Sequence, residues 1–382
     1  MGAETEIVRG KSILCIVPLP PPITGAAIAS ETIVNYLKQS YDVVVIPYQR
    51  GNLISGRFSL RQFLKIFVLG LKLRKLRYRK THFDAIYLVI STTFWGNMRD
   101  LFFLTVLNNK LQGKTVLHLH GANIDRYLKR ASFLVKFFNK RLLGKVRRAI
   151  VLGESFKNLF EGYIANNKIS IVKNYFTPSL LIDEASLLQK FNLTEKVNIL
   201  FLSNLIKEKG YELLLDAFLS LKEEISSRAI LHFAGEIYSD KEKVLFLNKI
   251  KNGDNIFYHG PVAGREKRDI LWKSHLFCLP TYYRYEGQPI SILEAYASGC
   301  VVLTTNNGGI KDIFQDGING FFIDIDIDID ITKSKLREKL EMIIVNTNKY
   351  KHIAMFNFAE ASEKYTEMRF CKEIEQILLM NG

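Results

Sequence analysis

The sequence predicts an α/β fold made of two Rossmann-like, doubly wound domains, each built on a parallel sheet. The chain has 382 residues, a length that suits two cores of roughly 180 residues each better than a single core. Short apolar runs alternate with helix-like stretches along most of the chain. Between two series of such runs, residues 174–191 lose the strand pattern and contain Pro178, as expected of a connection between domains.

The first series defines an N-terminal domain over residues 1–175. A helix with small residues is expected over 25–38, directly after the first strand. The expected strands are residues 12–18, 43–46, 85–90, 116–120 and 149–152. The second series defines a C-terminal domain over residues 190–364, with a helix over 210–221. Its expected strands are residues 198–203, 230–234, 256–258, 276–279, 301–304 and 320–323.

The last stretch, residues 365–379, is amphipathic and predicts a helix. In two-domain folds of this kind such a helix often returns to the first domain, so residues 365–382 are assigned to the N-terminal domain. Ligands of open α/β sheets bind beyond the carboxyl ends of the strands. We therefore expect the two domains to face a shared cleft.

Composition excludes several classes of protein. Hydrophobic residues make up 48% and charged residues 24%, values of a folded globular chain rather than of a disordered or polytopic membrane protein. The four cysteines are scattered and form no Cys-x-x-Cys pair, which argues against a zinc site or a disulfide framework. The N-terminal apolar run is short and ends in prolines, unlike a signal peptide. A cytoplasmic location is therefore expected.

Positive charge is concentrated in the first half of the chain. Residues 1–180 contain 28 Lys and Arg against 9 Asp and Glu, a balance of +19, whereas the remainder has 25 against 29, a balance of −4. This asymmetry favours an anionic partner for the first half: a membrane leaflet, a phosphorylated substrate or a nucleic acid. Residues 57–80 combine nine Lys or Arg with many apolar residues and no acid. They predict either a membrane-binding amphipathic helix or a core-facing helix with a solvated basic face.

The strongest chemical signal begins at Glu286 and runs Glu-Gly-Gln-Pro-Ile-Ser-Ile-Leu-Glu after a predicted strand. Gly287 and Pro289 suit a tight turn into a helix, whose free N–H groups and positive end would bind phosphate. Gln288 and Ile290 belong to the same turn. Glu286 can accept hydrogen bonds from sugar hydroxyls, and Glu294, one to two turns into the helix, can hold a ribose diol. Taken alone, the two acids have an ordinary structural explanation.

The longer segment EGQPISILEAYASGCVVLTTNNGGIKDIFQDGINGFF resembles the donor-binding region of family-4 retaining glycosyltransferases. Their E-x7-E motif is followed by a small-residue helix end, a strand, a Gly-Gly turn and a D-G-x-N-G turn. The matching positions are Glu286, Glu294, Ala297, Gly299, Gly308, Gly309, Asp316, Gly317, Asn319 and Gly320. The resemblance implies a GT-B fold with an N-terminal acceptor-binding domain and a C-terminal domain that binds a nucleotide sugar.

Four more residues receive roles from this resemblance. Lys209 matches the lysine that stabilises the donor diphosphate, whereas Asn204 stands where the family often has arginine. Gly25 keeps part of a glycine turn that approaches the diphosphate. His120 matches a sugar-contacting histidine, and His118 on the same face of the strand stays an alternative. The catalytic residues implied are Glu286, His120 and Lys209.

The implied reaction transfers a hexose-type sugar, with retention, from a UDP- or GDP-linked donor to a lipid-linked or polysaccharide acceptor. Capsule, exopolysaccharide and lipopolysaccharide assembly at the inner face of the cell membrane would fit this chemistry. Electrostatic stabilisation of the leaving diphosphate requires no metal, and the alternating segment 324–330 is expected to be an exposed edge strand or loop rather than a metal site. Two other interpretations stay open: a nucleotide-sugar 2-epimerase of GT-B fold, and a basic membrane- or nucleic-acid-binding protein, although no nucleic-acid motif accompanies the charge. The chain lacks the G-x-G-x-x-G fingerprint of an NAD-dependent dehydrogenase near Gly25.

Overall fold

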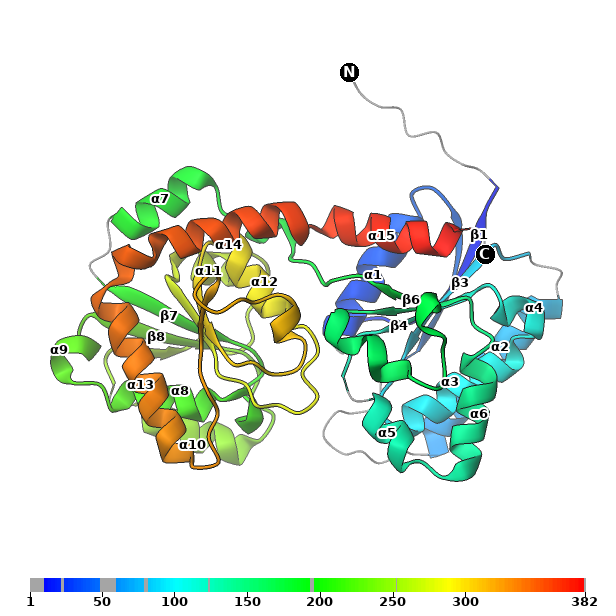
Figure 1. Cartoon of the computed structure of the whole chain (residues 1–382), viewed down its shortest axis with the longest axis horizontal. Helices are drawn as coiled ribbons and strands as arrows, with labels where there is room; N and C mark the ends of the chain where they lie inside the picture. Colours follow the sequence, from blue (N-terminus) through cyan, green and yellow to red (C-terminus); the bar gives the residue numbers. More distant parts are fainter. Residues whose placement is uncertain are drawn as a thin grey trace, which may run out of the picture. The chain divides into compact units, whose positions relative to one another are not determined.

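The computed structural model describes residues 10–21, 24–48, 60–78, 82–122, 124–192, 196–251 and 253–380. The chain divides into two compact units. Unit 1 comprises Met1–Lys173 and Met368–Gly382, and unit 2 comprises Asn174–Glu367. Each unit is a layered α/β structure with a central sheet and helices on both faces (Figure 1).

Unit 1 contains a six-stranded sheet in the order β2-β1-β3-β4-β5-β6, in which every neighbouring pair is parallel. The strands are β1 (Ser12–Pro18), β2 (Asp42–Tyr48), β3 (Ala85–Ile90), β4 (Thr115–Leu119), β5 (Arg148–Val151) and β6 (Ile169–Ile171). Residues of β1 and β3 are almost entirely buried, as parallel strands covered on both faces must be.

The helices of unit 1 cover both faces of this sheet. They are α1 (Gly25–Leu37), α2 (Leu60–Tyr78), α3 (Phe94–Val106), α4 (Asn109–Gln112), α5 (Ile124–Arg130), α6 (Phe133–Leu143) and α15 (Glu367–Leu379), with short 3-10 helices at Glu154–Phe160 and Asn166–Lys168. The connection from β1 to β2, through α1, crosses the sheet in one direction. The connections through α2, α3 and α6 cross it in the opposite direction. Because parallel crossovers are right-handed, α1 lies on one face and the α2-α3-α6 layer on the opposite face (Figure 1).

Unit 2 contains a second six-stranded parallel sheet, in the order β12-β11-β10-β7-β8-β9. The strands are β7 (Val197–Leu202), β8 (Ala229–Ala234), β9 (Ile256–Tyr258), β10 (Leu276–Leu279), β11 (Val301–Thr304) and β12 (Gly320–Phe322). The helices are α7 (Glu184–Asn192), α8 (Tyr211–Leu219), α9 (Glu223–Ser226), α10 (Asp240–Ile250), α11 (Gly264–Lys273), α12 (Ile290–Ala297), α13 (Ile329–Val345) and α14 (Lys351–Lys364). Short 3-10 helices lie at Pro178–Leu180, Lys207–Lys209, Ile310–Asp312 and Thr347–Tyr350.

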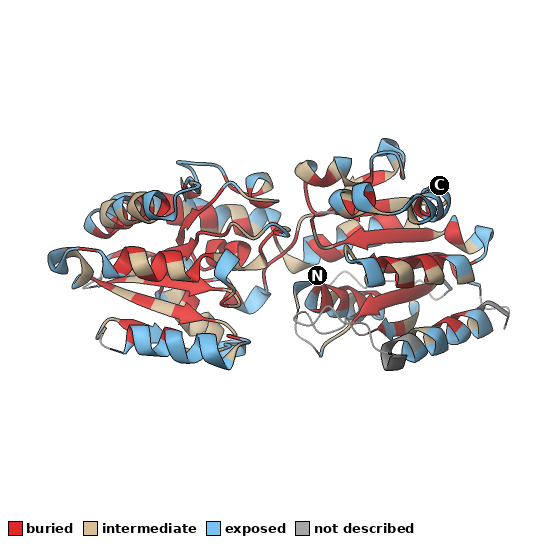
Figure 2. Cartoon of the chain, turned by 90° about the horizontal axis from the view of Figure 1, so that it is seen from below, coloured by how far each residue is buried: buried red, intermediate tan, exposed pale blue. Residues whose placement is uncertain are grey.

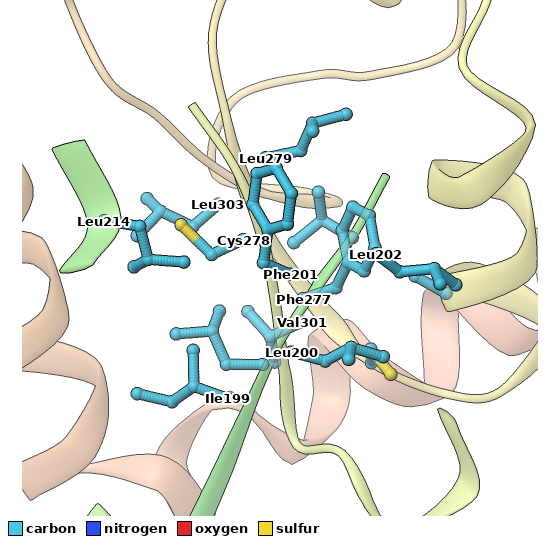
Figure 3. Packing of buried hydrophobic residues seen from close by; sticks show 14 of the residues in the cluster. Ile199, Leu200, Phe201, Leu202, Leu214, Phe277, Cys278, Leu279, Val301 and Leu303 are labelled. Carbon is cyan, nitrogen blue, oxygen red and sulfur yellow. The ribbon is translucent and has the colours of Figure 1, made fainter. Parts of the chain in front are cut away.

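The central strands of both sheets are buried, whereas the edge strands β2 and β9 are partly exposed and the outer helix faces are exposed (Figure 2). In unit 2, successive side chains of β7, β10 and β11 contribute to the core, including Phe201, Phe277 and Leu303 (Figure 3). Leu214 of α8 packs against the same cluster. The continuous apolar runs in the sequence therefore form strands that helices cover on both faces.

Two expectations from the sequence need correction. Strand β4 ends at Leu119, so His120 is the first residue of the following loop. Residues 174–191 are not a free connection, because Phe176, Leu180 and Leu187 lie in the core of unit 2. Strand β6 was not predicted. The segment 324–330 is a loop that enters α13, where the Asp328 carboxylate caps the helix.

The basic amphipathic segment forms α2, while residues 57–59, 79 and 80 lie outside the described residues. The C-terminal stretch forms α15, which buries Phe370, Ile374 and Leu378 in unit 1. No helix in the described ranges is both long and apolar enough to span a bilayer. The shared cleft between the two units stays a prediction.

Candidate active site

The site of unit 2 is built from two loops that follow neighbouring strands. Strands β7 and β10 are adjacent in the sheet, so the loops after Leu202 and Leu279 leave the same carboxyl edge. The loops are joined by the backbone N–H of Tyr282, which donates to the Glu208 carbonyl at 2.8 Å. The Thr281 hydroxyl oxygen also lies 3.3 Å from that carbonyl oxygen. This junction brings together residues that lie far apart in the sequence.

The ammonium group of Lys209 contacts both carboxylate oxygens of Glu286, at 2.9 Å (Oε1) and 2.7 Å (Oε2). The hydroxyl of Thr281 donates a third hydrogen bond, to Oε2 at 2.9 Å. The ring of Tyr283 lies 5.2 Å from the same ammonium nitrogen. The side chain of Lys209 is 15% exposed and that of Glu286 6%. The structure therefore confines one positive and one negative group in a largely dehydrated position.

Two glycines allow the backbone to close around this pair. Gly210 has φ +85°, and a Cβ at this position would lie 2.2 Å from the Pro280 carbonyl oxygen. Gly308 has φ +56°, and its Cβ would lie 2.2 Å from the Glu286 carbonyl oxygen. A side chain at either position would meet rigid backbone in a left-handed conformation. Both glycines are thus required by the close approach of the loops.

The turn into α12 is held from two sides. The Gly309 N–H donates to the Gly287 carbonyl at 3.0 Å. Asn174 uses its backbone N–H and its side-chain amide to bind Oε1 and the carbonyl of Gln288, at 2.6 and 2.9 Å. The side-chain oxygen of Gln288 therefore holds the loop inside unit 2. Pro289 is the N-cap and its side chain makes no capping bond, so the positive end of α12 at Ile290 has no side-chain acceptor from its own cap.

Glu294 lies on the second turn of α12 and forms a separate ion pair. Lys267 of α11 donates to Glu294 Oε1 at 2.6 Å. The Glu294 side chain is only 4% exposed, and that of Lys267 is 24% exposed. The carboxylate is thus oriented by one ammonium group. Oε2 accepts no other hydrogen bond within the described parts of the chain.

Asn204 is directed away from these groups. Its amide nitrogen donates to the hydroxyl of Tyr238 at 3.1 Å, in the loop after β8. The Leu205 N–H donates to the Glu236 carbonyl at 2.9 Å in the same loop. The position at which the resembling family often has arginine therefore belongs to the β7–β8 side of the sheet edge, and its amide does not contact Glu286 or Lys209.

In unit 1, Gly25 and His120 lie at the carboxyl edge of the sheet. Gly25 is the exposed first residue of α1, which is capped by the Thr24 hydroxyl through the Ala27 N–H at 3.2 Å. The rings of His118 and His120 have centroids 3.9 Å apart. His118 Nδ1 lies 2.6 Å from the Tyr87 hydroxyl. Burial lowers the pKa of His118 to about 3, so its ring is neutral at ordinary pH.

The structure also identifies site residues that the sequence interpretation missed. Thr281 and Tyr283 stand between the end of β10 and Glu286, a position in the loop that could have singled them out. Lys267 could not be found this way, because it precedes Glu294 by 27 residues on another helix. Across the described residues, no cluster of three or more His, Cys, Asp or Glu side chains could hold a metal ion.

Comparison with known proteins identifies the domain that holds this pair. Residues 183–353 match the family model of the glycosyl transferases group 1. The matched region is less than half of the chain. It contains Lys209, Glu286, Lys267 and Glu294, so both ion pairs of the site lie within the matched region.

The chain is also similar to individual proteins of known sequence. It is 24% identical over 261 residues to an uncharacterized 41.2 kDa protein in the cps region of Klebsiella pneumoniae, an alignment that covers 66% of this chain and 68% of that protein. It is 32% identical over 159 residues to the mannosylfructose-phosphate synthase of Agrobacterium fabrum, but that alignment covers only 40% of this chain and 34% of the synthase.

Solved structures confirm the fold class. The chain superposes on Anabaena HepE in complex with UDP and glucose with a TM-score of 0.68 and 16% identity, covering 97% of this chain and 99% of that one. It superposes on WaaG, a glycosyltransferase involved in lipopolysaccharide biosynthesis, with a TM-score of 0.67 and 14% identity, covering 97% and 100%. The two six-stranded parallel sheets are thus those of a GT-B glycosyltransferase fold.

Proposed function

We propose that the chain is a retaining glycosyltransferase that moves a hexose-type sugar from a UDP- or GDP-linked donor to a lipid-linked or polysaccharide acceptor. The observation that supports this most is the Lys209–Glu286 pair beside the start of α12, within a group 1 glycosyl transferase domain. A nucleotide sugar presents a diphosphate, which can accept hydrogen bonds from an ammonium group. It also presents hydroxyl groups, which can donate hydrogen bonds to a carboxylate.

In this proposal the donor replaces the internal ion pair. Lys209 turns from Glu286 to the diphosphate, where it joins the N–H groups at the start of α12. Glu286 is then available to accept hydrogen bonds from the hydroxyls of the sugar, and Glu294 from those of the ribose. Charge that develops on the leaving diphosphate is stabilised by groups already in place. No step requires a metal ion.

The remaining roles rest on the family resemblance. Gly25 allows backbone approach to the diphosphate, His120 contacts the sugar, and Asn204 replaces a second cation. Retention of anomeric configuration follows from the same resemblance, by a front-face reaction in which a diphosphate oxygen helps deprotonate the acceptor.

The acceptor is assigned to cell-surface glycan assembly at the inner face of the membrane. The basic excess of residues 1–180, +19, favours an anionic acceptor or lipid surface. The presence of a relative in a cps region and the lipopolysaccharide role of WaaG both support glycan assembly. A polyprenyl-diphosphate sugar or a glycolipid combines the anionic group and the lipid anchor that such a protein would bind.

The test has two steps. A thermal-shift screen of UDP- and GDP-linked sugars should show stabilisation by one nucleotide class. Sugar transfer is then measured with the selected donor, with and without a lipid extract, and the anomeric configuration of the product is determined by NMR. We expect lipid-dependent transfer with retention. Release of a 2-epimerised free sugar without acceptor would instead establish an epimerase, and the absence of any nucleotide-sugar binding would exclude both enzymes.

A further inference from the structure

The α2-α3-α6 layer of unit 1 carries exposed apolar side chains on the side that faces away from the sheet. On α2, Leu64, Phe67, Val68 and Leu71 follow a spacing of three and four residues, so they form one stripe. The opposite stripe of the same helix, which includes Ile66, Leu69 and Leu73, packs on the core of unit 1. The core-facing interpretation of this segment is therefore confirmed, although the outer face of α2 is apolar as well as basic. Membrane binding by this segment stays a prediction.

Helix α6 has the same arrangement, which was not predicted from the sequence. Phe133, Leu134, Phe137 and Phe138 lie on its outer face, while Asn139, Leu142 and Leu143 are buried. Two aromatic residues at the start of α3, Phe94 and Trp95, add to the same layer. Together these ten side chains are between 46% and 79% exposed: Leu64, Phe67, Val68, Leu71, Phe94, Trp95, Phe133, Leu134, Phe137 and Phe138.

Packing within the layer fixes these stripes relative to one another. Helix α3 lies between α2 and α6, and contacts both. Asn97 and Asn139 exchange two hydrogen bonds of 2.9 Å between α3 and α6. Tyr127 of α5 donates to Asn97 at 3.1 Å and its ring lies 6.4 Å from that of Phe94. Because the three helices cover one face of the sheet, their outer sides point away from it together (Figure 1).

The charge around these stripes selects the partner. Residues 60–145, which span the layer, contain 18 Lys and Arg against 3 Asp and Glu. A second copy of the chain would bring two strongly basic faces together, which electrostatic repulsion opposes. A nucleic acid would pair with the Lys and Arg side chains around the stripes, but it would leave the apolar side chains of the stripes without a partner. Apolar and aromatic side chains on the outermost line, flanked by Lys and Arg, are the pattern of an element that inserts into an anionic lipid interface.

We infer that α2, α6 and the start of α3 form a membrane-binding face that inserts side chains into an anionic phospholipid leaflet. This inference rests on the proposed function only for the lipid-linked nature of the acceptor. The N-termini of α3 and α6 lie at the carboxyl edge of the sheet, since helices of parallel crossovers run antiparallel to the strands. His120 follows β4 at that same edge. A leaflet bound to this face would therefore hold lipid head groups close to His120.

The two tryptophans of the chain make the test direct. Trp95 lies in the proposed face, whereas Trp272 lies in unit 2, where its indole donates to the Leu180 carbonyl at 3.0 Å. In a Trp272→Phe background, Trp95 reports alone. We expect its emission to shift to shorter wavelength with vesicles of phosphatidylglycerol mixed with phosphatidylcholine, and not with phosphatidylcholine alone. High salt should weaken this binding without abolishing it, because the inserted side chains are apolar.

Substitutions then separate insertion from simple charge attraction. Phe133→Ser with Phe137→Ser should lower vesicle binding at least ~10-fold, since each Phe loses burial in lipid. The matched control is Val244→Ser with Leu245→Ser, an equally exposed apolar pair on α10 of unit 2, which should bind as the parent does. Equal binding by both variants, a Trp95 spectrum unchanged by bound vesicles, or preferential binding to RNA would overturn the inference. Nucleotide-sugar stabilisation of the same variants is measured in parallel, so a failure here is distinguishable from failure of the transferase assignment.

Discussion

Lys209 and Glu286, 77 residues apart in the sequence, are bound to each other by two hydrogen bonds of 2.7 and 2.9 Å. The residue proposed to bind the diphosphate and the residue proposed to bind the sugar thus form an ion pair with each other. Under the proposed function, donor binding separates them. The anionic diphosphate can do this, because it offers Lys209 a replacement acceptor while its sugar offers donors to Glu286.

Substitutions of this pair should be strongly coupled. Lys209→Met and Glu286→Gln should each lower sugar transfer at least ~100-fold, the magnitude lost with a preorganised electrostatic contact. Each single change also leaves a mostly buried charge without its partner, which destabilises unit 2. The double variant should therefore be less destabilised than the sum of the two singles in urea unfolding. Additive losses in stability would contradict the ion pair, and near-normal transfer in both single variants would refute the site.

Lys267 should act on ribose binding through Glu294. Lys267→Met should weaken binding of the preferred nucleoside diphosphate about 10-fold, by the loss of a charged hydrogen bond that orients the carboxylate. The same substitution should have little effect on binding of the 2′,3′-dideoxy analogue, which lacks the hydroxyls that Glu294 would accept. Calorimetric titration of both ligands measures this difference. Lys273→Met, at the exposed end of α11, is the control; an equal loss for both ligands would exclude a role at the ribose.

Gly308 should be essential for donor binding because a larger residue would collide with the backbone of Glu286. Gly308→Ala would place Cβ 2.2 Å from the Glu286 carbonyl oxygen and must displace the loop that carries this carboxylate. Gly317 is a close control, since it also has a positive φ, +77°, but has no atom within 4 Å of the added Cβ. Both alanines should cost about 1–2 kcal/mol of stability through the left-handed backbone. Only Gly308→Ala should lose donor-induced thermal stabilisation; similar losses in both would point to backbone strain alone.

The burial of His118 should make unit 1 sensitive to acid. Its pKa falls to about 3 in the folded state, below the unfolded value of about 6.5. The unfolded chain therefore binds the proton first, and this contribution to stability is complete above pH ~6.5 and decreases toward pH ~3. In His118→Asn, the slope of the free energy of unfolding against pH near pH 5 should decrease by about one proton, ~1.4 kcal/mol per pH unit. Urea unfolding followed at Trp95 in a Trp272→Phe background measures it. An unchanged slope would mean that His118 protonates in the folded state.

Most strands could be predicted because parallel strands buried on both faces leave continuous apolar runs, as in β1, β3 and β7. Strand β6 escaped prediction because it is only three residues long and its middle residue is Ser170, so it leaves no continuous apolar run. Residues 174–191 were misassigned for a different reason. Their apolar residues follow no single period, and only the spacing of Leu187 and Phe191 marks the short helix α7, yet tertiary packing buries Phe176, Leu180 and Leu187 in unit 2.

Part of the candidate site was predicted residue by residue, but its contacts were not. Glu286, Glu294 and Lys209 were identified from local motifs, whereas the order β10-β7 that brings Lys209 to Glu286 is a property of the sheet. The contact between Lys267 and Glu294 likewise depends on how α11 lies beside α12. Helix α6 was overlooked because a stripe of phenylalanines in sequence does not reveal whether it faces the core or the solvent.

The placement of α15 sets the order in which the molecule can be completed. Glu375 binds the hydroxyls of Tyr36 and Tyr41, at 2.7 and 2.5 Å, and Arg147 binds the carbonyls of Ile377 and Leu378. During synthesis these partners emerge from the ribosome more than two hundred residues before α15 does. Unit 2 is a continuous stretch of chain, so it can finish folding before α15 is complete. Until then, unit 1 exposes the apolar surface that α15 will cover.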